Sequence, residues 1–241
     1  MKHGRGFSLI EMAFVLVIIT LLLGGLLVPF ATQVEQRRIA ETQKAMDEIK
    51  EALLGYAVAN GRLPCPDTLD SNDGVEDPPG GPCPANTVGN LPWATLGVGV
   101  ADAWGNHFTY QVTPEFSDPA TPFNFATSGT LRVCATNACP SFLASKIPAV
   151  IVSHGKNGYG AVSANTPVGA AITNAAPGGK DELQNIHKTL PPSTDFVSRI
   201  QTGPRPACND GTATPCEFDD LVTWLSPNIL FNRMVAAGKL P

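Results

Sequence analysis

The sequence has no long run of basic residues and no cysteine pair spaced C-x-x-C. Its 16 lysines and arginines make no run longer than Arg37-Arg38, and the net charge is −5. Because phosphate groups are bound by clustered positive charge, we expect no nucleic acid partner. Because the C-x-x-C spacing is typical of zinc and redox sites, we do not expect the cysteines to form either kind of site.

The six cysteines are better explained as disulfides. They fall into three near pairs along the sequence: Cys65 with Cys83, Cys134 with Cys139, and Cys208 with Cys216. Six cysteines allow many connectivities, so this nearest-neighbour pairing is one of several possibilities. Such disulfides would place the folded part of the chain in an oxidising compartment, which in bacteria is the periplasm or beyond.

The sequence also lacks the G-x-S-x-G turn that presents a nucleophilic serine in α/β hydrolases. Ser153-His154 is the pair that most invites a catalytic interpretation. Isolated histidines, however, are usually surface residues or hydrogen-bonded core residues. We therefore predict that the protein is not an enzyme.

One long apolar run lies near the start of the chain. No residue from Met12 to Phe30 is charged, and at about 1.5 Å per residue this run spans most of a bilayer core. The basic residues Lys2 and Arg5 precede it. The pattern predicts a transmembrane helix over residues 7–30 in the inner membrane, with the N-terminus in the cytoplasm and the rest of the chain in the periplasm.

Helical signals continue beyond this apolar run. A stripe with spacings of three and four residues predicts an amphipathic helix over residues 31–60. Its members are Ile39, Thr42, Met46, Ile49, Leu53 and Tyr56. Asn60-Gly61 followed by Pro64 supplies the stop. We therefore predict one helix of about fifty residues that begins in the membrane and ends packed on a globular domain.

The remaining residues, 61–241, combine short strand-like segments with irregular loops. Segments 107–112, 130–135 and 149–153 are rich in β-branched and aromatic residues, which favours strands. Segment 228–237 favours a short closing helix. Together these features predict an α+β fold, in which the long N-terminal helix packs on a small antiparallel β-sheet with long, disulfide-pinned loops.

The first residues carry a specific motif. The stretch GFSLIEM, residues 6–12, resembles the prepilin cleavage motif of type IV pilins and type II secretion pseudopilins. The resemblance implies a pilin-like fold and a leader peptide over residues 1–6. It also implies that a prepilin peptidase cuts between Gly6 and Phe7 and methylates the new amino group of Phe7. The glutamate of the family's motif corresponds to Glu11.

Glu11 places a carboxylate at the start of the apolar run, and a charge at the centre of a membrane helix costs about 2.5 kcal/mol or more. In a helical stack, the amino group of Phe7 in one subunit can approach Glu11 of its neighbour, so that each neutralises the other. The alternative is that Glu11 merely reaches the cytoplasmic headgroups.

The resemblance therefore implies a structural subunit of a type IV pilus or a type II secretion pseudopilus, one that forms part of a periplasmic or cell-surface filament. Its partners would be other pilin or pseudopilin subunits, the inner-membrane assembly platform and membrane lipid. The size of the chain suits a specialised or minor pilin. The competing hypothesis is a signal-anchored periplasmic binding protein or enzyme.

Two later segments are similar to the major pseudopilin of type II secretion. SHGKNGYG, residues 153–160, resembles its glycine-rich loop, and DDLVTW, residues 219–224, resembles its D-I-x-x-W segment. In that family these segments bind one calcium ion. The resemblance places candidate calcium ligands at Asn157 and Asp220.

Asn157 is uncharged where the family's loop is acidic. Calcium takes about six to eight oxygen ligands, often including several carboxylates. We expect Asp181, Glu182 or Asp219 to supply the missing charge. The alternative is a loop without metal, ordered by a disulfide and hydrogen bonds.

Overall fold

The structure is a computed structural model that describes residues 8–68, 72–85, 87–165, 179–186 and 193–240, without the side chains of residues 22–29. The chain divides into two units, Met1–Ala40 and Glu41–Pro241. The expected cleavage site, Gly6 and Phe7, lies outside the described residues, as do several side chains of the expected membrane segment.

A single helix, α1 (Leu9–Asn60), belongs to both units. It ends where the stop signal predicts, because Gly61 takes a left-handed conformation with φ of 72° and donates its N–H to the carbonyl of Ala57. Within the second unit the predicted stripe faces inward, and Ile49 and Leu53 are at most 1% exposed. Residues 41–60 therefore form a wall of the core of the second unit.

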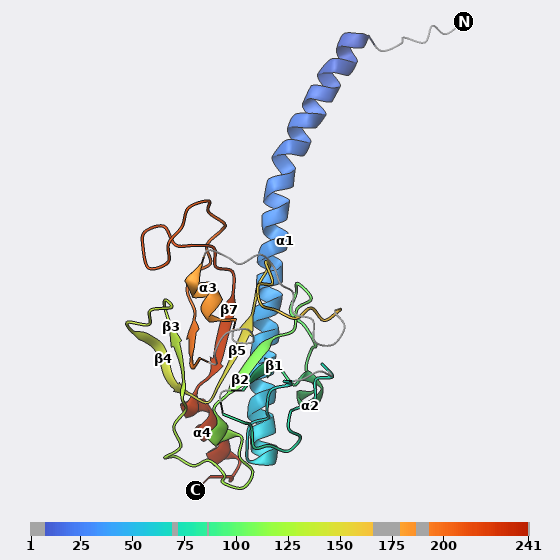
Figure 1. The fold of residues 1–241 in the computed structure, drawn as a ribbon. Helices are drawn as coiled ribbons and strands as arrows, with labels where there is room; N and C mark the ends of the chain where they lie inside the picture. The colour runs from blue at the N-terminus through green and yellow to red at the C-terminus, as the bar shows by residue number, and fades with distance from the viewer. Residues whose placement is uncertain (1–7, 69–71, 86, 166–178, 187–192, 241) are drawn as a thin grey trace, which may run out of the picture. The chain divides into compact units, whose positions relative to one another are not determined.

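The second unit is built on a four-stranded antiparallel sheet in the order β1-β2-β5-β7 (Figure 1). Its strands are β1 (Val88–Asn90), β2 (Thr109–Val112), β5 (Ala149–Ser153) and β7 (Leu221–Leu225). Every residue of β5 is buried. Ile151 packs into one core with residues of α1, whereas Val150 and Val152 pack into a second core on the opposite face.

A second sheet of three strands shares that second core (Figure 1). Its order is β4-β3-β6, from β4 (Phe142–Ile147), β3 (Leu131–Cys134) and β6 (Asp195–Val197). Strand β6 runs parallel to β3. Val133 and Phe196 pack with Val150 and Val152 of the first sheet. The four-stranded sheet is thus a middle layer between α1 and the second sheet.

The predicted α+β class, with a helix on an antiparallel sheet, is confirmed, and β2, β3 and β5 lie in the three predicted strand segments. The described residues also form a second sheet, which the sequence analysis did not predict. Strand β6 is only three residues long, and β4 exposes neighbouring apolar residues instead of alternating them. Neither segment therefore carries a strand pattern that sequence alone reveals.

Four short helical segments complete the described part of the unit: α2 (Trp93–Leu96), the 3-10 helix η1 (Pro114–Phe116), α3 (Lys180–Gln184) and α4 (Pro227–Ala236). The closing helix lies within one residue of its predicted bounds. Pro227 suits its first turn because a proline there sacrifices no helical hydrogen bond. Leu230 and Met234 bury one face of α4 in the core with α1.

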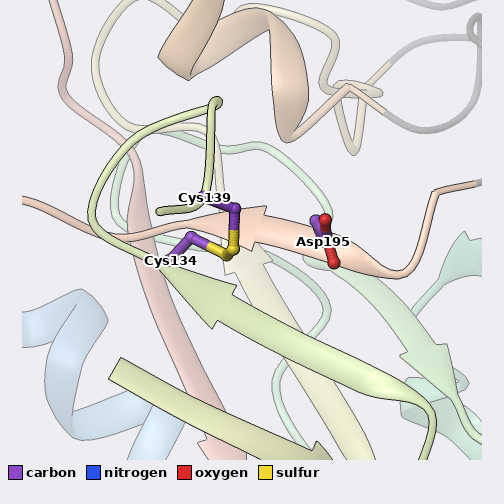
Figure 2. Close-up of side chains that lie close together, drawn as sticks. All are labelled: Cys134, Cys139 and Asp195. Atoms are coloured by element: carbon purple, nitrogen blue, oxygen red, sulfur yellow. A yellow bond between two sulfur atoms is a disulfide. The ribbon is translucent and has the colours of Figure 1, made fainter. Parts of the chain in front are cut away.

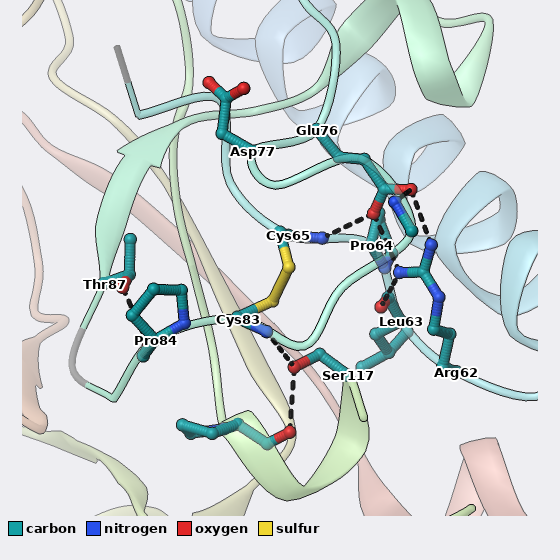
Figure 3. Close-up of a disulfide and its surroundings, with 12 residues drawn as sticks. Arg62, Leu63, Pro64, Cys65, Glu76, Asp77, Cys83, Pro84, Thr87 and Ser117 are labelled. Carbon is teal, nitrogen blue, oxygen red and sulfur yellow. Dashed lines mark hydrogen bonds and ion pairs between the residues drawn. A yellow bond between two sulfur atoms is a disulfide. The ribbon is translucent and has the colours of Figure 1, made fainter. Parts of the chain in front are cut away.

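Three disulfides are present, and they follow the nearest-neighbour pairing: Cys65–Cys83, Cys134–Cys139 and Cys208–Cys216. Figure 3 shows the first of them beside a buried ion pair. Arg62 donates to both carboxylate oxygens of Glu76, at 2.6 and 2.8 Å, and the Cys65 N–H donates to the same carboxylate at 3.0 Å. The disulfide and the ion pair together fix the proline-rich loop that follows α1.

The second disulfide closes a short loop at the end of β3 (Figure 2). Cys134, Cys139 and Asp195 lie close together, but the two sulfur atoms are bonded to each other and provide no thiolate for a metal. Asp195 instead accepts two hydrogen bonds of 2.6 Å from Arg132. This cluster is therefore a structural staple of the second sheet.

Candidate functional site

The first candidate site is the beginning of α1. The Ser8 N–H donates to Glu11 Oε2 at 2.8 Å, and the Glu11 N–H donates to Ser8 Oγ at 3.3 Å. This reciprocal pair is a capping box, which satisfies N–H groups that a helix start leaves without partners. Sequence reasoning missed this role of Glu11, although the S-x-x-E spacing was its signal. Among the described residues, the Glu11 carboxylate accepts from Ser8 through Oε2.

Apolar side chains on both sides of Glu11 in the sequence lie on the surface of the first unit. Leu9 is 90% exposed, Phe14 64% and Leu16 62%. Exposed apolar surface of this extent is typical of a segment that contacts lipid or another protein. In the described residues, however, no helix meets both the length and the apolarity that crossing a membrane requires.

The second candidate site is a cluster of three carboxylates in the second unit. Glu182 comes from α3, and Asp219 and Asp220 directly precede β7. One oxygen of each lies within 4.8 Å of the other two. Glu182 is fully buried and Asp220 is 3% exposed. Among the described residues, Glu182 Oε2, Asp219 Oδ1 and Asp220 Oδ1 are buried without a hydrogen-bond partner.

The glycine-rich loop, residues 154–160, closes one side of this cluster. Asn157 donates its backbone N–H to Asp219 Oδ2 at 2.8 Å and its side-chain amide to Glu182 Oε1 at 2.7 Å. Gly155 has a φ of 57°, and a Cβ at this position would lie 2.4 Å from the Asp219 carbonyl oxygen. Only glycine permits this approach. Asn157 thus orients two of the three carboxylates.

The remaining contacts of Asp220 fix the third carboxylate. Asn185 donates its side-chain amide to Asp220 Oδ2 at 2.7 Å, and His154 Nδ1 lies 3.7 Å from Asp220 Oδ1. His154 is 1% exposed, and its other ring nitrogen lies 2.9 Å from Thr109 Oγ1. Ser153 is also buried and donates to Asp102 at 2.7 Å. The Ser153-His154 pair is therefore enclosed in polar packing.

The burial of three acidic groups together has an electrostatic cost. Burial, followed by repulsion from Asp220 and by interactions with Asp219, raises the pKa of Glu182 to about 9. Burial likewise raises the pKa of Asp219. Without a cation, Glu182 therefore holds a proton at neutral pH. A divalent cation at the cluster would replace this proton, because metal ligands bind in their ionised form.

Asp181, which was expected as a candidate ligand, lies outside the cluster. Its carboxylate accepts from Arg199 Nε at 2.8 Å and from the Asn137 N–H at 2.8 Å. Successive side chains on a helix point about 100° apart, so Asp181 and its neighbour Glu182 face different partners. The sequence named both residues but could not distinguish them without the register of α3.

These residues fit calcium. It is a hard cation that prefers carboxylate and carbonyl oxygens, and each carboxylate of the cluster presents an oxygen that has no hydrogen-bond partner among the described residues. Asn157 Oδ1 already accepts the Tyr159 N–H at 2.9 Å. Glu182, Asp219 and Asp220 are therefore the residues that would hold the ion, with Asn157 as their support.

Comparison with known proteins bears on the first site. The family described as the prokaryotic N-terminal methylation motif matches residues 1–27. No curated protein and no solved structure matches the chain. The match confirms the N-terminal methylation motif that the resemblance to type IV pilins and pseudopilins led us to expect, and it covers residues 1–27 only.

Proposed function

We propose that this protein is a prepilin-like subunit that is cut between Gly6 and Phe7, methylated at Phe7, and polymerised through α1 into a type IV pilus or type II secretion pseudopilus. One observation carries the proposal: the methylation motif opens directly onto a helix whose apolar side chains are exposed. Such a helix needs an apolar environment, first lipid and then the helices of neighbouring subunits. The function is assembly, with no reaction catalysed.

In this proposal the precursor sits in the inner membrane with its N-terminus in the cytoplasm and its second unit in the periplasm. Cleavage creates a positive amino group at Phe7, directly before Ser8, which forms the capping box with Glu11. One oxygen of Glu11 serves the helix start of its own subunit. The other accepts the amino group of a neighbour, which neutralises two charges in an apolar setting and sets the register between subunits.

The proposal is tested by the intact mass and N-terminal sequence of the protein from its own cell envelope. We expect a chain that begins at Phe7 and carries one added methyl group. A chain that begins at Met1 would overturn the proposal and favour the signal-anchored binding protein or enzyme. Recovery of the processed chain from sheared surface filaments would then favour a pilus, and its retention in the periplasm would favour a pseudopilus.

We also propose that the second unit binds one calcium ion at Glu182, Asp219 and Asp220. The support is the set of three buried oxygen atoms without partners, which converge from α3 and from the segment before β7. When bound, calcium supplies positive charge to this acidic cluster. The residues of the chain then hold the glycine-rich loop, α3 and the start of β7 in one arrangement.

Calorimetric titration of the full-length protein in detergent with calcium tests this second proposal. We expect binding that Asp220→Asn weakens at least tenfold. Asp118→Asn is a matched control, because Asp118 is an acidic residue that takes no part in the cluster. A flat titration of the wild-type protein would end the calcium proposal and leave the proposal of a filament subunit intact.

A further inference from the structure

Arg199 forms a second polar centre in the part of the unit that holds the carboxylate cluster. Its side chain is only 13% exposed, and its guanidinium group lies 4.6 Å from the centre of the Phe218 ring. Nε donates to Asp181 Oδ2 at 2.8 Å, and Nη2 donates to Asp210 Oδ1 at 3.3 Å. Further donations reach Thr202 Oγ1 at 2.9 Å and the Cys216 carbonyl at 3.0 Å. One planar cation therefore joins several chain segments.

Asp210 extends this centre into the third disulfide loop. Its Oδ2 accepts the N–H of Asp181 at 3.0 Å, and its Oδ1 accepts the N–H of Cys216 at 2.9 Å. The Cys208–Cys216 disulfide closes the loop that carries Asp210. Through Asp210, the loop closed by this disulfide is thereby hydrogen-bonded to the first turn of α3.

Asp181 extends the centre in the opposite direction. Its Oδ1 accepts the N–H of Asn137, which lies in the loop closed by Cys134–Cys139 (Figure 2 shows this disulfide). Both disulfide loops therefore hold α3 at Asp181, one through its backbone N–H and the other through its carboxylate. Asp181 directly precedes Glu182, so the direction in which Asp181 is held also decides where Glu182 points.

The helix α3 depends on such contacts for its position. It has only five residues, and its N-cap residue Gly179 offers no side-chain cap. A helix this short has little stability of its own. Its side chains bind on both sides: Asp181 binds Arg199, whereas Glu182 and Asn185 bind Asn157 and Asp220. The Arg199 contacts therefore fix α3 from the side opposite the cluster.

We propose that Arg199 is the positioning residue of the cation site. By holding Asp181 and Asp210, it fixes the rotation of α3 that brings Glu182 beside Asp219 and Asp220. The guanidinium also pairs with both Asp181 and Asp210, so these two carboxylates are engaged away from the cation. This inference rests on the calcium site proposed above. It adds that the affinity of the site depends on a residue that donates nothing to the metal.

Lysine cannot replace arginine in this role. The guanidinium group is a rigid planar fork with five donors, whereas the lysine ammonium is a single point charge on a flexible stem. An ammonium group can pair with Asp181 or Asp210 but cannot span both together with Thr202 and the Cys216 carbonyl. Arg199→Lys therefore keeps the charge and removes the geometry.

The chain offers a matched control for this variant. Arg132 also pairs with an aspartate, Asp195, and also lies over a phenylalanine ring, that of Phe142 at 5.2 Å. Among the described residues its side chain donates to Asp195 and not to Asp181 or the cluster, and α3 reaches this pair through Gln184, which donates to the Asp195 carbonyl. Arg132→Lys thus carries the same chemical change at a site where cation binding should not respond.

The experiment titrates full-length wild type, Arg199→Lys and Arg132→Lys in detergent with calcium by calorimetry. It also measures the luminescence lifetime of bound europium, which counts the water molecules on the ion. For Arg199→Lys we expect about tenfold weaker calcium binding and at least one additional water on europium, because Glu182 leaves the ion. For Arg132→Lys we expect wild-type affinity and hydration. A merely structural role of Arg199 would lower stability without adding water.

An Arg199→Lys protein with wild-type affinity and hydration would overturn the inference while leaving the calcium site in place. If Arg199→Lys does not fold, Asp181→Asn provides the second test, because it removes the charge from the same contact while keeping an oxygen for the Asn137 N–H. We expect the same loss of affinity and the same additional water, and wild-type behaviour overturns the inference. A wild-type protein that binds neither ion overturns the calcium site and this inference together.

Discussion

In the first unit the apolar side chains of α1 point outward, whereas in the second unit the same helix buries them in a core. Leu16 is 62% exposed and Leu53 is fully buried, although both are leucines of one continuous helix. The second unit adds two sheets and three disulfides, whereas the described part of the first unit is helix alone. The difference indicates that the second unit buries its apolar side chains in its own core, while the described part of the first leaves them exposed.

Replacing Glu11, the acidic residue of the capping box in the first unit, should have the largest effect on function. For Glu11→Ala we expect incorporation into filaments to fall by roughly tenfold or more, because the amino group of a neighbour then lacks its partner at a cost of about 2.5 kcal/mol. The second unit should unfold as in wild type. Immunoblots of sheared filaments and of whole envelopes measure the incorporated fraction.

Glu11→Gln separates the two roles of this residue. Glutamine keeps an oxygen that can accept the Ser8 N–H, as Glu11 Oε2 does at 2.8 Å, but it carries no charge. If charge pairing sets the register, Glu11→Gln fails to assemble like Glu11→Ala. Normal assembly of Glu11→Gln would instead show that the capping box is what matters, and the charge-pair mechanism would be wrong.

The leucines of α1 allow the same substitution to be compared in both units. Leu53→Ala should lower the free energy of unfolding of the second unit by about 2 to 5 kcal/mol, because it leaves a cavity in the core. Leu16→Ala should change it by less than about 0.5 kcal/mol. All three tryptophans lie in the second unit, so urea unfolding followed by tryptophan fluorescence reports on that unit alone.

In the filament assay we expect Leu16→Ala to have a larger effect than Leu53→Ala, the reverse of their order in the unfolding experiment. Leu16→Ala, nearly silent in the unfolding experiment, should impair assembly if α1 packs against neighbouring helices there. A Leu16→Ala protein that assembles at the wild-type level would contradict the proposed role of the exposed face. Equal destabilisation by both substitutions would contradict the contrast between the two units itself.

The disulfides should stabilise the second unit according to the length of the loop that each closes. Cys65 and Cys83 are 18 residues apart, and Cys134 and Cys139 are 5 apart. Replacing the first pair by alanines should cost about 3 kcal/mol of unfolding free energy, and replacing the second pair about 2 kcal/mol. Urea unfolding of the two double variants measures the difference. The reverse order would mean that native contacts outweigh chain entropy here.

Much of the fold was predictable because its signals are local. Asn60-Gly61 predicts the end of α1. The strand β5 is a continuous, mostly apolar segment that begins and ends at the predicted residues. The second sheet was not predictable, because β6 forms only through parallel pairing with a strand about sixty residues away. The three residues of β6 do not by themselves indicate that they pair with β3.

Part of the candidate cation site was likewise predictable from the sequence, and part was not. The motifs drew attention to the glycine-rich loop and to Asp220, but the choice of Glu182 over Asp181 depends on the rotation of α3. That rotation is set by Arg199, which no motif marks. Side chains that act through distant partners are beyond local patterns, because their role appears only when the chain has folded.

The carboxylate cluster is the place where the second unit is also incomplete, and its dependence on pH should reveal this. Without calcium, burial and its acidic neighbours raise the pKa of Glu182 from an ordinary value of 4.5 to about 9. The folded state therefore holds a proton that the unfolded state releases. Stability from this group is fully present below the ordinary pKa and is lost as the pH rises toward 9.

We accordingly expect the unfolding free energy of the chelator-treated protein to fall between about pH 5 and pH 9, by at most about 1.4 kcal/mol per pH unit for one proton. Urea unfolding at a series of pH values measures the slope. Glu182→Gln should flatten it, because the amide does not titrate, and saturating calcium should do the same by displacing the proton. A slope that Glu182→Gln leaves unchanged would have to come from another group, and the second unit would then need no cation to complete it.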